Sequence, residues 1–288
     1  MARIAALVVA YHSYDEIVAL LDSFAAASDG RHEIDVHVIE NSGDRGEMDK
    51  LAALPGITFV ANEKNLGYGG GMNALVASLT ETYDWYLVCN PDIRFSPGSI
   101  DELLAADARH PSAGLFGPRL RGEDGLVYPS ARAFPSIRTG IGHALLANIW
   151  AGNPWTRKYH RSGGAAQNTD TEVDWLSGAC LLVRPEAFHA VDGFDEGYFM
   201  YFEDVDLGWR LSKLGYTAMY IPSAEIVHSG AHSTSRQASF MRTVHHQSAA
   251  RYLTRKYSAW YLAPLRVGLR VALYLRREFF RYGNSRQG

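Results

Sequence analysis

Hydrophobic and polar positions along the first third of the chain fall into blocks that predict alternating strands and helices. Apolar residues at helical spacing follow the first strand-like run, where Ser13 and Glu16 match a capping box. Ser96 and Pro97 have the N-cap and N1 preferences of another helix start. Strands that alternate with helices are typical of a parallel sheet covered on both faces. Residues 4–10 have the composition of a strand buried on both faces, and further strands are predicted at 34–39, 57–61 and 85–89.

The pattern changes after Gly114. Two extended runs flank the turn at residues 122–125 and predict a hairpin. Residues 134–172 lack periodicity, so we expect irregular, mobile loops there. The chain is therefore predicted to be α/β, with a mostly parallel sheet followed by a smaller mixed region. The further elements expected are strands at 179–183, 218–221 and 226–228 and a helix at 202–214.

Composition narrows the class of protein. With 47% hydrophobic and 20% charged residues, the chain is globular rather than disordered or fibrous. Cys89 and Cys180 both lie in apolar runs, which excludes a disulfide scaffold and favours a reducing compartment. The sequence contains no apolar run of the roughly 18 residues that a membrane span needs, and we expect no signal peptide at its start.

Charge is distributed unevenly along the chain. The net charge is −3, but residues 241–288 carry ten basic residues against Glu278 alone, so they are +9 and residues 1–240 are −12. Within 260–282, arginines at helical spacing lie opposite leucines, which predicts a basic amphipathic helical tail. Such a tail either docks on an anionic membrane surface or packs on the protein or a second subunit. The acidic body is not typical of a nucleic-acid binder.

Polar residues cluster where the predicted parallel strands end. Ligands of open parallel sheets bind beyond the carboxyl ends of the strands, so these residues are the first candidates for a site. They are Tyr11 and His12 after the first strand, Glu40 and Asn41 after the second, Asn65 to Asn73 after the third, and Asn90 and Asp92 after the fourth.

The glycine-rich segment between residues 67 and 71 is not a complete dinucleotide fingerprint. Met72 stands where glycine or alanine is required, and the segment follows the third strand rather than the first. It is either a tight turn at a glycine-rich helix start or a place where backbone amides approach a nucleotide. The sequence has no Gly-Lys dipeptide and no Gly-x-Ser-x-Gly, which excludes a P-loop and weighs against an α/β-hydrolase.

Two further positions could bind a cation. Asp92 follows a fully apolar strand and can reach a hard divalent ion, although Asn-Pro-Asp is also good turn chemistry. His228 and His232 resemble a zinc pair without a third close ligand. A single histidine, His228, that joins Asp92 on one ion is the better interpretation; the alternative is a strand-end histidine bonded to backbone.

The densest acidic cluster, Glu203, Asp204 and Asp206, lies among aromatic residues. Carboxylates beside apolar rings acquire raised pKa values and can act as general bases. Helix-dipole preference also explains acids at a helix start, and Asp206 can pair with Arg210 four residues on. We expect one of the three acids to be functional and Asp206 to be structural.

In their order along residues 4–235, these motifs resemble glycosyltransferase family 2, inverting enzymes of the GT-A fold, and within it the bacterial rhamnosyltransferase-like branch. Two departures concern the donor side: Glu40 replaces the usual Asp, and Asn90 replaces the first Asp of the metal motif. The matching segments are Tyr11-His12, Glu40-Asn41-Ser42-x-Asp44, Asn65 through Asn73, Asn90-Pro91-Asp92, Phe202 through Leu207, and His228.

The resemblance implies a role for each of these positions. Asp92 and His228 would hold Mg²⁺ or Mn²⁺, and Asp204 would be the catalytic base, with Glu203 and Trp175 on the acceptor side. One GT-A domain would span residues 1–240, with a nucleotide-sugar half at 1–112 and an acceptor half at 113–240, followed by the tail at 241–288. The implied donor-binding residues are Tyr11, Glu40, Asn41, Asn65, Gly67, Tyr68, Gly69, Asn73 and Asn90.

The resemblance also implies substrates and a location. The expected reaction transfers L-rhamnose from dTDP-rhamnose to a glycan or polyprenyl-diphosphate-linked acceptor, in the cytoplasm on the inner face of the plasma membrane. A homodimer is possible, and no nucleic acid is involved. The alternatives are another donor, UDP-galactofuranose or a UDP-hexose, and a non-catalytic nucleotide- or glycan-binding module. The joint presence of Asp92, Asp204 and His228 argues against that last alternative.

Overall fold

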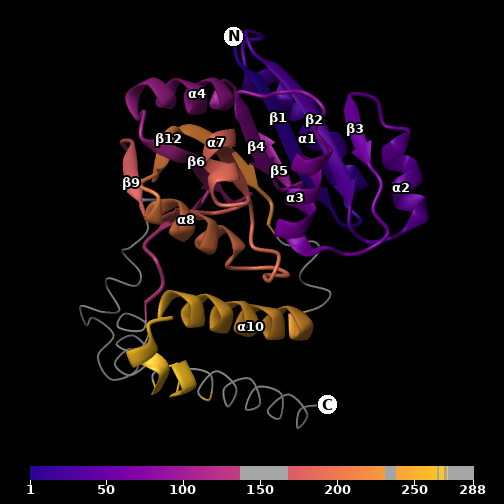
Figure 1. Cartoon of the computed structure of the whole chain (residues 1–288). Coiled ribbons are helices and arrows are strands. Elements are labelled where there is room, and N and C mark those ends of the chain that lie inside the picture. Colours follow the sequence, from indigo (N-terminus) through magenta and orange to yellow (C-terminus); the bar gives the residue numbers. More distant parts are fainter. Residues whose placement is uncertain (137–167, 231–237, 265, 269–270, 272–288) are drawn as a thin grey trace.

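The computed structural model describes residues 1–136, 168–230, 238–264, 266–268 and 271 (Figure 1). Most of the stretch predicted to be irregular and mobile, and most of the predicted helix at 260–282, therefore lie outside the described residues. Thr171–Val173, which begins within the last two residues of the stretch predicted as loops, forms a strand (β9).

The N-terminal half contains the predicted parallel sheet. Its strands lie in the order β3-β2-β1-β4, and every neighbouring pair is parallel. All five residues of β4 are buried, as expected of a strand covered on both faces. The strands are β1 (Arg3–Ala10), β2 (Glu33–Glu40), β3 (Ile57–Val60) and β4 (Trp85–Cys89), and the helices among and after them are α1 (Tyr14–Ala27), α2 (Arg45–Ala52), α3 (Gly67–Ser78) and α4 (Ser99–Arg109).

The C-terminal half extends the same sheet with mixed pairing, in the order β4-β11-β6-β12-β5. β11 is antiparallel to β4, whereas β12 is parallel to β6. A separate two-stranded sheet pairs β8 with β10. These strands are β5 (Ile93–Phe95), β6 (Ala113–Arg121), β7 (Val127–Tyr128), β8 (Ala131–Arg132), β10 (Trp175–Leu176), β11 (Cys180–Val183) and β12 (Thr217–His228).

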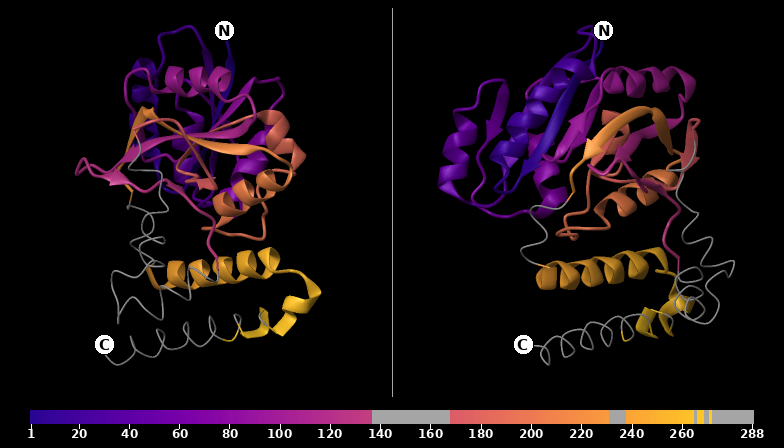
Figure 2. Two further views of the ribbon diagram at one scale, coloured as in Figure 1. Left: turned by 90° about the vertical axis from the view of Figure 1, so that its left-hand side faces the viewer. Right: turned by 180° about the vertical axis from the view of Figure 1, so that it is seen from behind.

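Alternate residues of β1 enter two hydrophobic cores on opposite faces of the sheet. Ile4 and Val8 belong to the core that α1 and α4 cover. Leu7 and Val9 belong to the other core, which is covered by α3, α7 (Pro185–Ala190) and α8 (Glu203–Lys213). The two helical layers are seen from the side and from behind in Figure 2. This arrangement is the predicted α/β architecture.

Helix α10 (Ala238–Lys256) lies alongside α8 (Figure 1). Its Tyr252 is fully buried against Val205 and Tyr198 of the acceptor half. A short 3₁₀ turn, Trp260–Leu262, follows it. The first part of the predicted tail therefore packs on the domain. Among the described residues, no helix is both long and apolar enough to cross a membrane.

Three local predictions are wrong. Ser13 does not cap α1, because its Oγ accepts a hydrogen bond from Tyr11 N in the preceding turn (3.0 Å). Ser96 and Pro97 do not begin a helix, because β5 pairs with β12 there and α4 begins only after Gly98, whose φ is +72°. The strands expected at 218–221 and 226–228 are one strand, β12, with a register shift between Ile221 and Glu225.

Candidate active site

Glu40 and Asn41, at the end of β2, form hydrogen bonds to the turn after β1 and to the start of α3. Glu40 is fully buried, and its Oε1 accepts hydrogen bonds from Ser42 N (2.7 Å) and His12 N (3.4 Å). Asn41 Nδ2 donates to the carbonyl of Gly67 (2.8 Å) at the start of α3. The two residues thus fix the turns after β1 and β2 beside the glycine-rich helix, while Tyr11 lies half-buried in the first of those turns.

The glycines at the start of α3 are explained by close packing against the acceptor half. Gly67 has a φ of +73°, and a Cβ there would overlap the carbonyl oxygen of Phe199. A Cβ at Gly69 would lie 2.8 Å from Cβ of Phe194. The amides of Gly67 and Tyr68 already donate to Asn65 Oδ1 (2.9 Å) and to the Phe199 carbonyl (3.0 Å). These contacts favour the interpretation as a glycine-rich helix start.

Tyr68 and Asn73 on α3 both reach across to the acceptor half. The hydroxyl of Tyr68 donates to the carbonyl of Gly178 (2.6 Å), and burial raises the pKa of this phenol well above its usual range. Asn73 makes two hydrogen bonds to the backbone of Phe194, one donated and one accepted, both 2.9 Å long. Both side chains therefore connect the two halves of the chain. The sequence predicted them only as donor-binding residues and did not reveal this structural role.

Asn90, Asp92 and His228 meet where β4 and β12 end. The Oδ1 of Asp92 lies 3.2 Å from Nε2 of His228, and Nδ2 of Asn90 lies 3.4 Å from the same nitrogen. Burial alone would raise the pKa of Asp92, but the hydrogen bond and charge of His228 outweigh it and hold that pKa below its usual value. The predicted pairing of His228 with Asp92, far apart in sequence, is present in the fold.

The chemistry of this cluster fits a divalent cation. A carboxylate oxygen and an imidazole nitrogen are ligands that Mn²⁺ and Mg²⁺ accept, and the Asn90 amide could add an oxygen after rotation. Within the described residues there is no group of three His, Cys, Asp or Glu side chains that could hold a metal. His232, the partner in the discounted zinc pair, lies outside the described residues.

Two acids begin α8 after a strained turn. Tyr201 and Phe202 have φ values of +66° and +68°, the left-handed region that ordinary residues rarely adopt. Asp204 Oδ2 accepts a hydrogen bond from Gly178 N (3.0 Å), and Oδ1 accepts one from Val205 N (2.8 Å). This geometry holds the Asp204 carboxylate at a fixed place beside the end of β10.

Burial dominates the proton affinity of both acids. It raises the pKa of Asp204, although the two backbone donors and the charge of Arg132 oppose it. Burial, and then the charge of Asp204, raise the pKa of Glu203 well above its usual value. The Oε2 of Glu203 is buried without a hydrogen-bond partner in the described part of the chain. A carboxylate with raised pKa is a stronger base, which is the property expected of the functional acid.

Asp206 is structural, as predicted. It is fully buried, and its carboxylate accepts from Arg210 Nε (2.6 Å), from Arg255 Nη1 (3.1 Å) and from the hydroxyl of Tyr198 (3.2 Å). The predicted pair with Arg210 is confirmed. Arg255, which comes from α10, was not foreseen because nothing local in sequence links it to this acid.

Trp175, which we expect on the acceptor side, lies on β10. Its indole Nε1 donates to the carbonyl of Ala133 (3.1 Å), and its strand β10 packs against α8 at Gly208. Arg132, on the paired strand β8, was missed by sequence reasoning. Its guanidinium carbon lies 5.7 Å from the centre of a Trp175 ring and 5.8 Å from that of Tyr128. Because these rings come from distant segments, no sequence pattern marks this arginine.

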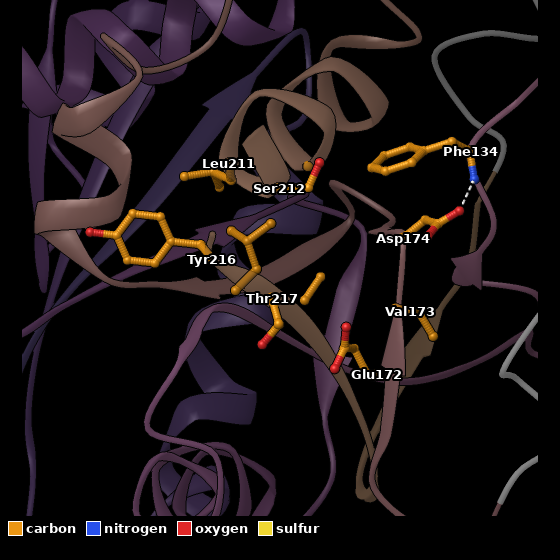
Figure 3. Close-up of a pocket in the computed structure, with 11 residues that line it drawn as sticks. Phe134, Glu172, Val173, Asp174, Leu211, Ser212, Tyr216 and Thr217 are labelled. Atoms are coloured by element: carbon orange, nitrogen blue, oxygen red, sulfur yellow. Dashed lines mark hydrogen bonds between the residues drawn. The ribbon is translucent and has the colours of Figure 1, made fainter. Parts of the chain in front are cut away.

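A small cavity of about 70 Å³ lies elsewhere, near the C-terminal half of α8 (Figure 3). Leu211, Ser212 and Tyr216 line one side of it, and Glu172 and Asp174 the other. Sites for small molecules usually enclose about 300–1,000 Å³, so this cavity is too small for a nucleotide sugar. It contains none of the predicted site residues.

Comparisons with known proteins agree with the motif order. The family model described as "Glycosyltransferase like family 2" matches residues 2–261. The chain is 45% identical over 247 residues to N-acetylglucosaminyl-diphospho-decaprenol L-rhamnosyltransferase of Mycobacterium tuberculosis, covering 81% of this chain and 80% of the relative. It is 28% identical over 261 residues to rhamnosyltransferase WbbL of Escherichia coli, covering 87% and 92%.

Solved structures share the fold at low identity. The mannosyltransferase PcManGT of Pyrobaculum calidifontis, in complex with GDP-Man and Mn²⁺, superposes with a TM-score of 0.61 at 14% identity, covering 96% of this chain and 71% of that one. GalNAc-T7 with UDP, GalNAc and Mn²⁺ gives 0.59 at 12% identity, covering 95% and 55%. These similarities show a GT-A fold, as predicted.

Proposed function

This chain belongs to glycosyltransferase-like family 2, and from that membership we propose that it transfers L-rhamnose to a sugar carried on a polyprenyl diphosphate. The proposed donor is dTDP-rhamnose. The observation that carries the proposal is the 45% identity, over four-fifths of both chains, to a relative named for rhamnosyl transfer to N-acetylglucosaminyl-diphospho-decaprenol. Two observations support it: Asp92 lies 3.2 Å from His228 where β4 and β12 end, and Asp204 at the start of α8 accepts a hydrogen bond from Gly178 N.

The donor would bind at the carboxyl ends of β1, β2 and β4. Tyr11, Glu40 and Asn41 border the turns where the nucleoside would lie, and the start of α3 from Asn65 to Asn73 closes that side. Asp92 and His228, with Asn90 beside them, would hold Mg²⁺ or Mn²⁺. Such a cation, when bound, offsets negative charge on a departing diphosphate.

Asp204 would act as the general base. Its carboxylate takes the proton of the acceptor hydroxyl while that oxygen attacks the anomeric carbon from the face opposite the nucleotide. The new carbon–oxygen bond forms as the bond to the diphosphate breaks, and the nucleoside diphosphate leaves with the bonding electrons. One displacement inverts the anomeric centre, so no enzyme nucleophile is needed. The amides of Gly178 and Val205 hold the carboxylate in place.

Acceptor recognition is assigned to the region around α8. Glu203 and Trp175 flank the base on this side, and the raised pKa of Glu203 favours its protonated form, which can donate a hydrogen bond. A lipid-linked acceptor would be presented at a membrane surface. We therefore assign the protein to the inner face of the plasma membrane, with contact through residues beyond 256.

The test is a donor panel. Purified protein with Mn²⁺ and an N-acetylglucosaminyl-diphospho-prenol is offered dTDP-rhamnose, UDP-galactofuranose and UDP-hexoses, and the product's anomeric configuration is read by NMR. Transfer from dTDP-rhamnose with inversion is expected. Preference for another donor, retention of configuration, or binding without turnover would overturn the proposal.

The Asp204→Asn variant tests the base. We expect kcat to fall about 100-fold or more with donor affinity nearly unchanged, since a general base contributes 10²- to 10⁴-fold. Glu203→Gln is the matched variant, because it changes the neighbouring acid in the same way. If Glu203→Gln is the more damaging change, the base has been assigned to the wrong residue.

A further inference from the structure

We propose that Arg132, held between the rings of Tyr128 and Trp175, binds the diphosphate of the acceptor. This inference rests on the proposed function, since it assumes an acceptor sugar linked to a diphosphate. It assigns a binding group to a residue that neither the motifs nor the predicted site contain.

The guanidinium of Arg132 is fixed in place. Its Nε donates to the carbonyl of Pro129 (2.7 Å), and its central carbon lies within 6 Å of two aromatic ring centres, Tyr128 at 5.8 Å and Trp175 at 5.7 Å. Cation–π contacts of this kind hold a planar guanidinium without using its terminal N–H donors. Among the described residues nothing bonds to the two terminal nitrogens, which could bind two oxygens of one phosphate group.

Arg132 forms no close ion pair in the described part of the chain, although its charge acts on Asp204 at longer range. Among the described residues, no carboxylate lies within 4.0 Å of its guanidinium, and its one hydrogen bond runs from Nε to the carbonyl of Pro129. Arg184 and Arg210, also partly buried, each pair with an aspartate. A half-buried arginine without an acidic partner is typical of a group that receives an anion from outside the chain.

Arg132 lies between the two chemical centres of the site. Its charge lowers the pKa of Asp204, against the larger effect of burial, so it is within electrostatic range of the proposed base. Tyr128, on its other side, makes an edge-to-face contact with the ring of His228 at 6.2 Å. An anion bound to Arg132 would therefore be close to the acceptor hydroxyl as well as to the leaving group.

The acceptor's diphosphate is favoured over the donor's. Asp92 and His228 would serve the donor diphosphate, because they would hold a cation that offsets its charge. Arg132, beside Trp175, would be the cationic group for the second diphosphate, that of the acceptor. A sugar whose hydroxyl reaches Asp204 carries its own diphosphate about one ring's width away. The exposed Tyr128 and the half-buried Trp175 would provide apolar faces beside that ring.

The experiment compares two acceptors in steady-state kinetics, N-acetylglucosaminyl-diphospho-farnesol and the neutral farnesyl N-acetylglucosaminide. For Arg132→Gln we expect KM for the diphosphate acceptor to rise about tenfold or more, with KM for the donor unchanged and little effect on the neutral acceptor. Arg132→Lys keeps the charge and should recover part of the loss. Arg109→Gln, on α4, is the matched control and should behave as wild type.

Other results would overturn the inference. A rise of the donor KM with both acceptors would assign Arg132 to the donor diphosphate. An equal loss of kcat with both acceptors, together with a lower Tm, would show a structural role only. If the wild type uses neither acceptor, the proposed function fails instead. Calorimetry with farnesyl diphosphate then still tests Arg132, since Arg132→Gln must weaken that binding and Arg109→Gln must not.

Discussion

Arg255 of α10 donates a hydrogen bond to Asp206 of α8, with 3.1 Å between Nη1 and Oδ1, although Asp206 is completely buried. Arg255 also contacts Asp195, to which Arg251 donates at 2.8 Å. Two arginines of α10 therefore bind this helix to Asp206 of α8 and to Asp195 in the segment before α8. This part of the predicted tail packs on the C-terminal half of the domain.

Arg255→Gln should lower the free energy of unfolding by about 1–3 kcal/mol, because a buried carboxylate loses one of its two cationic partners while Arg210 remains. Urea denaturation measures the change. Arg109→Gln breaks a more exposed pair with Asp170 and should cost less than about 1 kcal/mol. Equal costs for the two variants would show that the α10 contact contributes no more than a surface ion pair.

Gly67→Ala should destabilise the protein by more than about 3 kcal/mol, since an added Cβ both strains a backbone at φ +73° and overlaps the Phe199 carbonyl. Gly30 is the control: its φ is +81°, yet no atom lies within 4 Å of an added Cβ. Gly30→Ala should therefore show the strain alone, about 1 kcal/mol. Similar Tm values for both variants would refute the close approach of α3 to residue 199.

The pKa of Glu203 predicts how stability changes with pH. Burial raises its pKa in the folded state, so the folded chain binds this proton more tightly than the unfolded chain. The tighter proton binding adds to the free energy of unfolding. This added stability is complete below the unfolded pKa of glutamate and is lost as pH rises toward the pKa of Glu203 in the folded chain. Glutamine does not titrate, so Glu203→Gln should gain stability relative to wild type as pH rises above the unfolded pKa of glutamate, about 4.3. Urea titrations of both proteins that stay parallel over this range would contradict the prediction.

Much of the fold can be predicted from the sequence because the central strands β1 and β4 are buried on both faces. Runs such as residues 85–89 contain almost only apolar residues, and the polar groups at their ends mark the sheet edge where the site lies. The pairing of Asp92 with His228 could be anticipated because each residue follows such a strand. The helix pair Asp206–Arg210 follows from spacing alone.

The features that the sequence did not predict depend on contacts between distant segments. The three-residue strand β5 exists only because β12 pairs with it, and its own sequence, Ile-Arg-Phe, is too short to be distinctive. From the sequence, the glycines of α3 could form a ligand-binding loop. In the structure, Gly67 and Gly69 are required by their close packing against Phe199 and Phe194. Arg132 could not be singled out from the sequence, because the rings that contact it, at positions 128 and 175, come together only in the folded chain.

Donor binding should need a divalent cation. Titration of nucleoside diphosphate into the protein is expected to give high affinity with Mn²⁺ and weak affinity with EDTA, because the charge of the diphosphate then lacks a counter-ion. Asp92→Ala should reproduce the EDTA result even with Mn²⁺ present, while Asp170→Ala, a carboxylate bonded to Arg109, should not. Equal affinity with and without the metal would remove the proposed role of Asp92 and His228.

Membrane attachment should depend on the segment after α10. Trp260 is 85% exposed and Tyr261 66% exposed, and Val267 and Val271 are also exposed. Residues 259–288 contain six arginines and one glutamate, whereas Arg251 and Arg255 are already engaged by Asp195. Aromatic rings of this kind enter the headgroup region, and each basic residue near an anionic leaflet contributes about 1 kcal/mol.

Sedimentation with anionic vesicles at low and high salt therefore provides the test. Wild-type protein should pellet with the vesicles at low salt and be released at high salt, because the charge contribution is screened. The double variant Trp260→Ala/Tyr261→Ala should bind markedly less, and deletion of residues 259–288 should abolish binding. Leu214→Ala removes another exposed apolar side chain, at the end of α8, and should leave binding unchanged. Vesicle binding that survives the deletion would place the membrane contact elsewhere, and failure of the full chain to bind at low salt would leave α10 and its neighbours as a purely structural cover of the acceptor side.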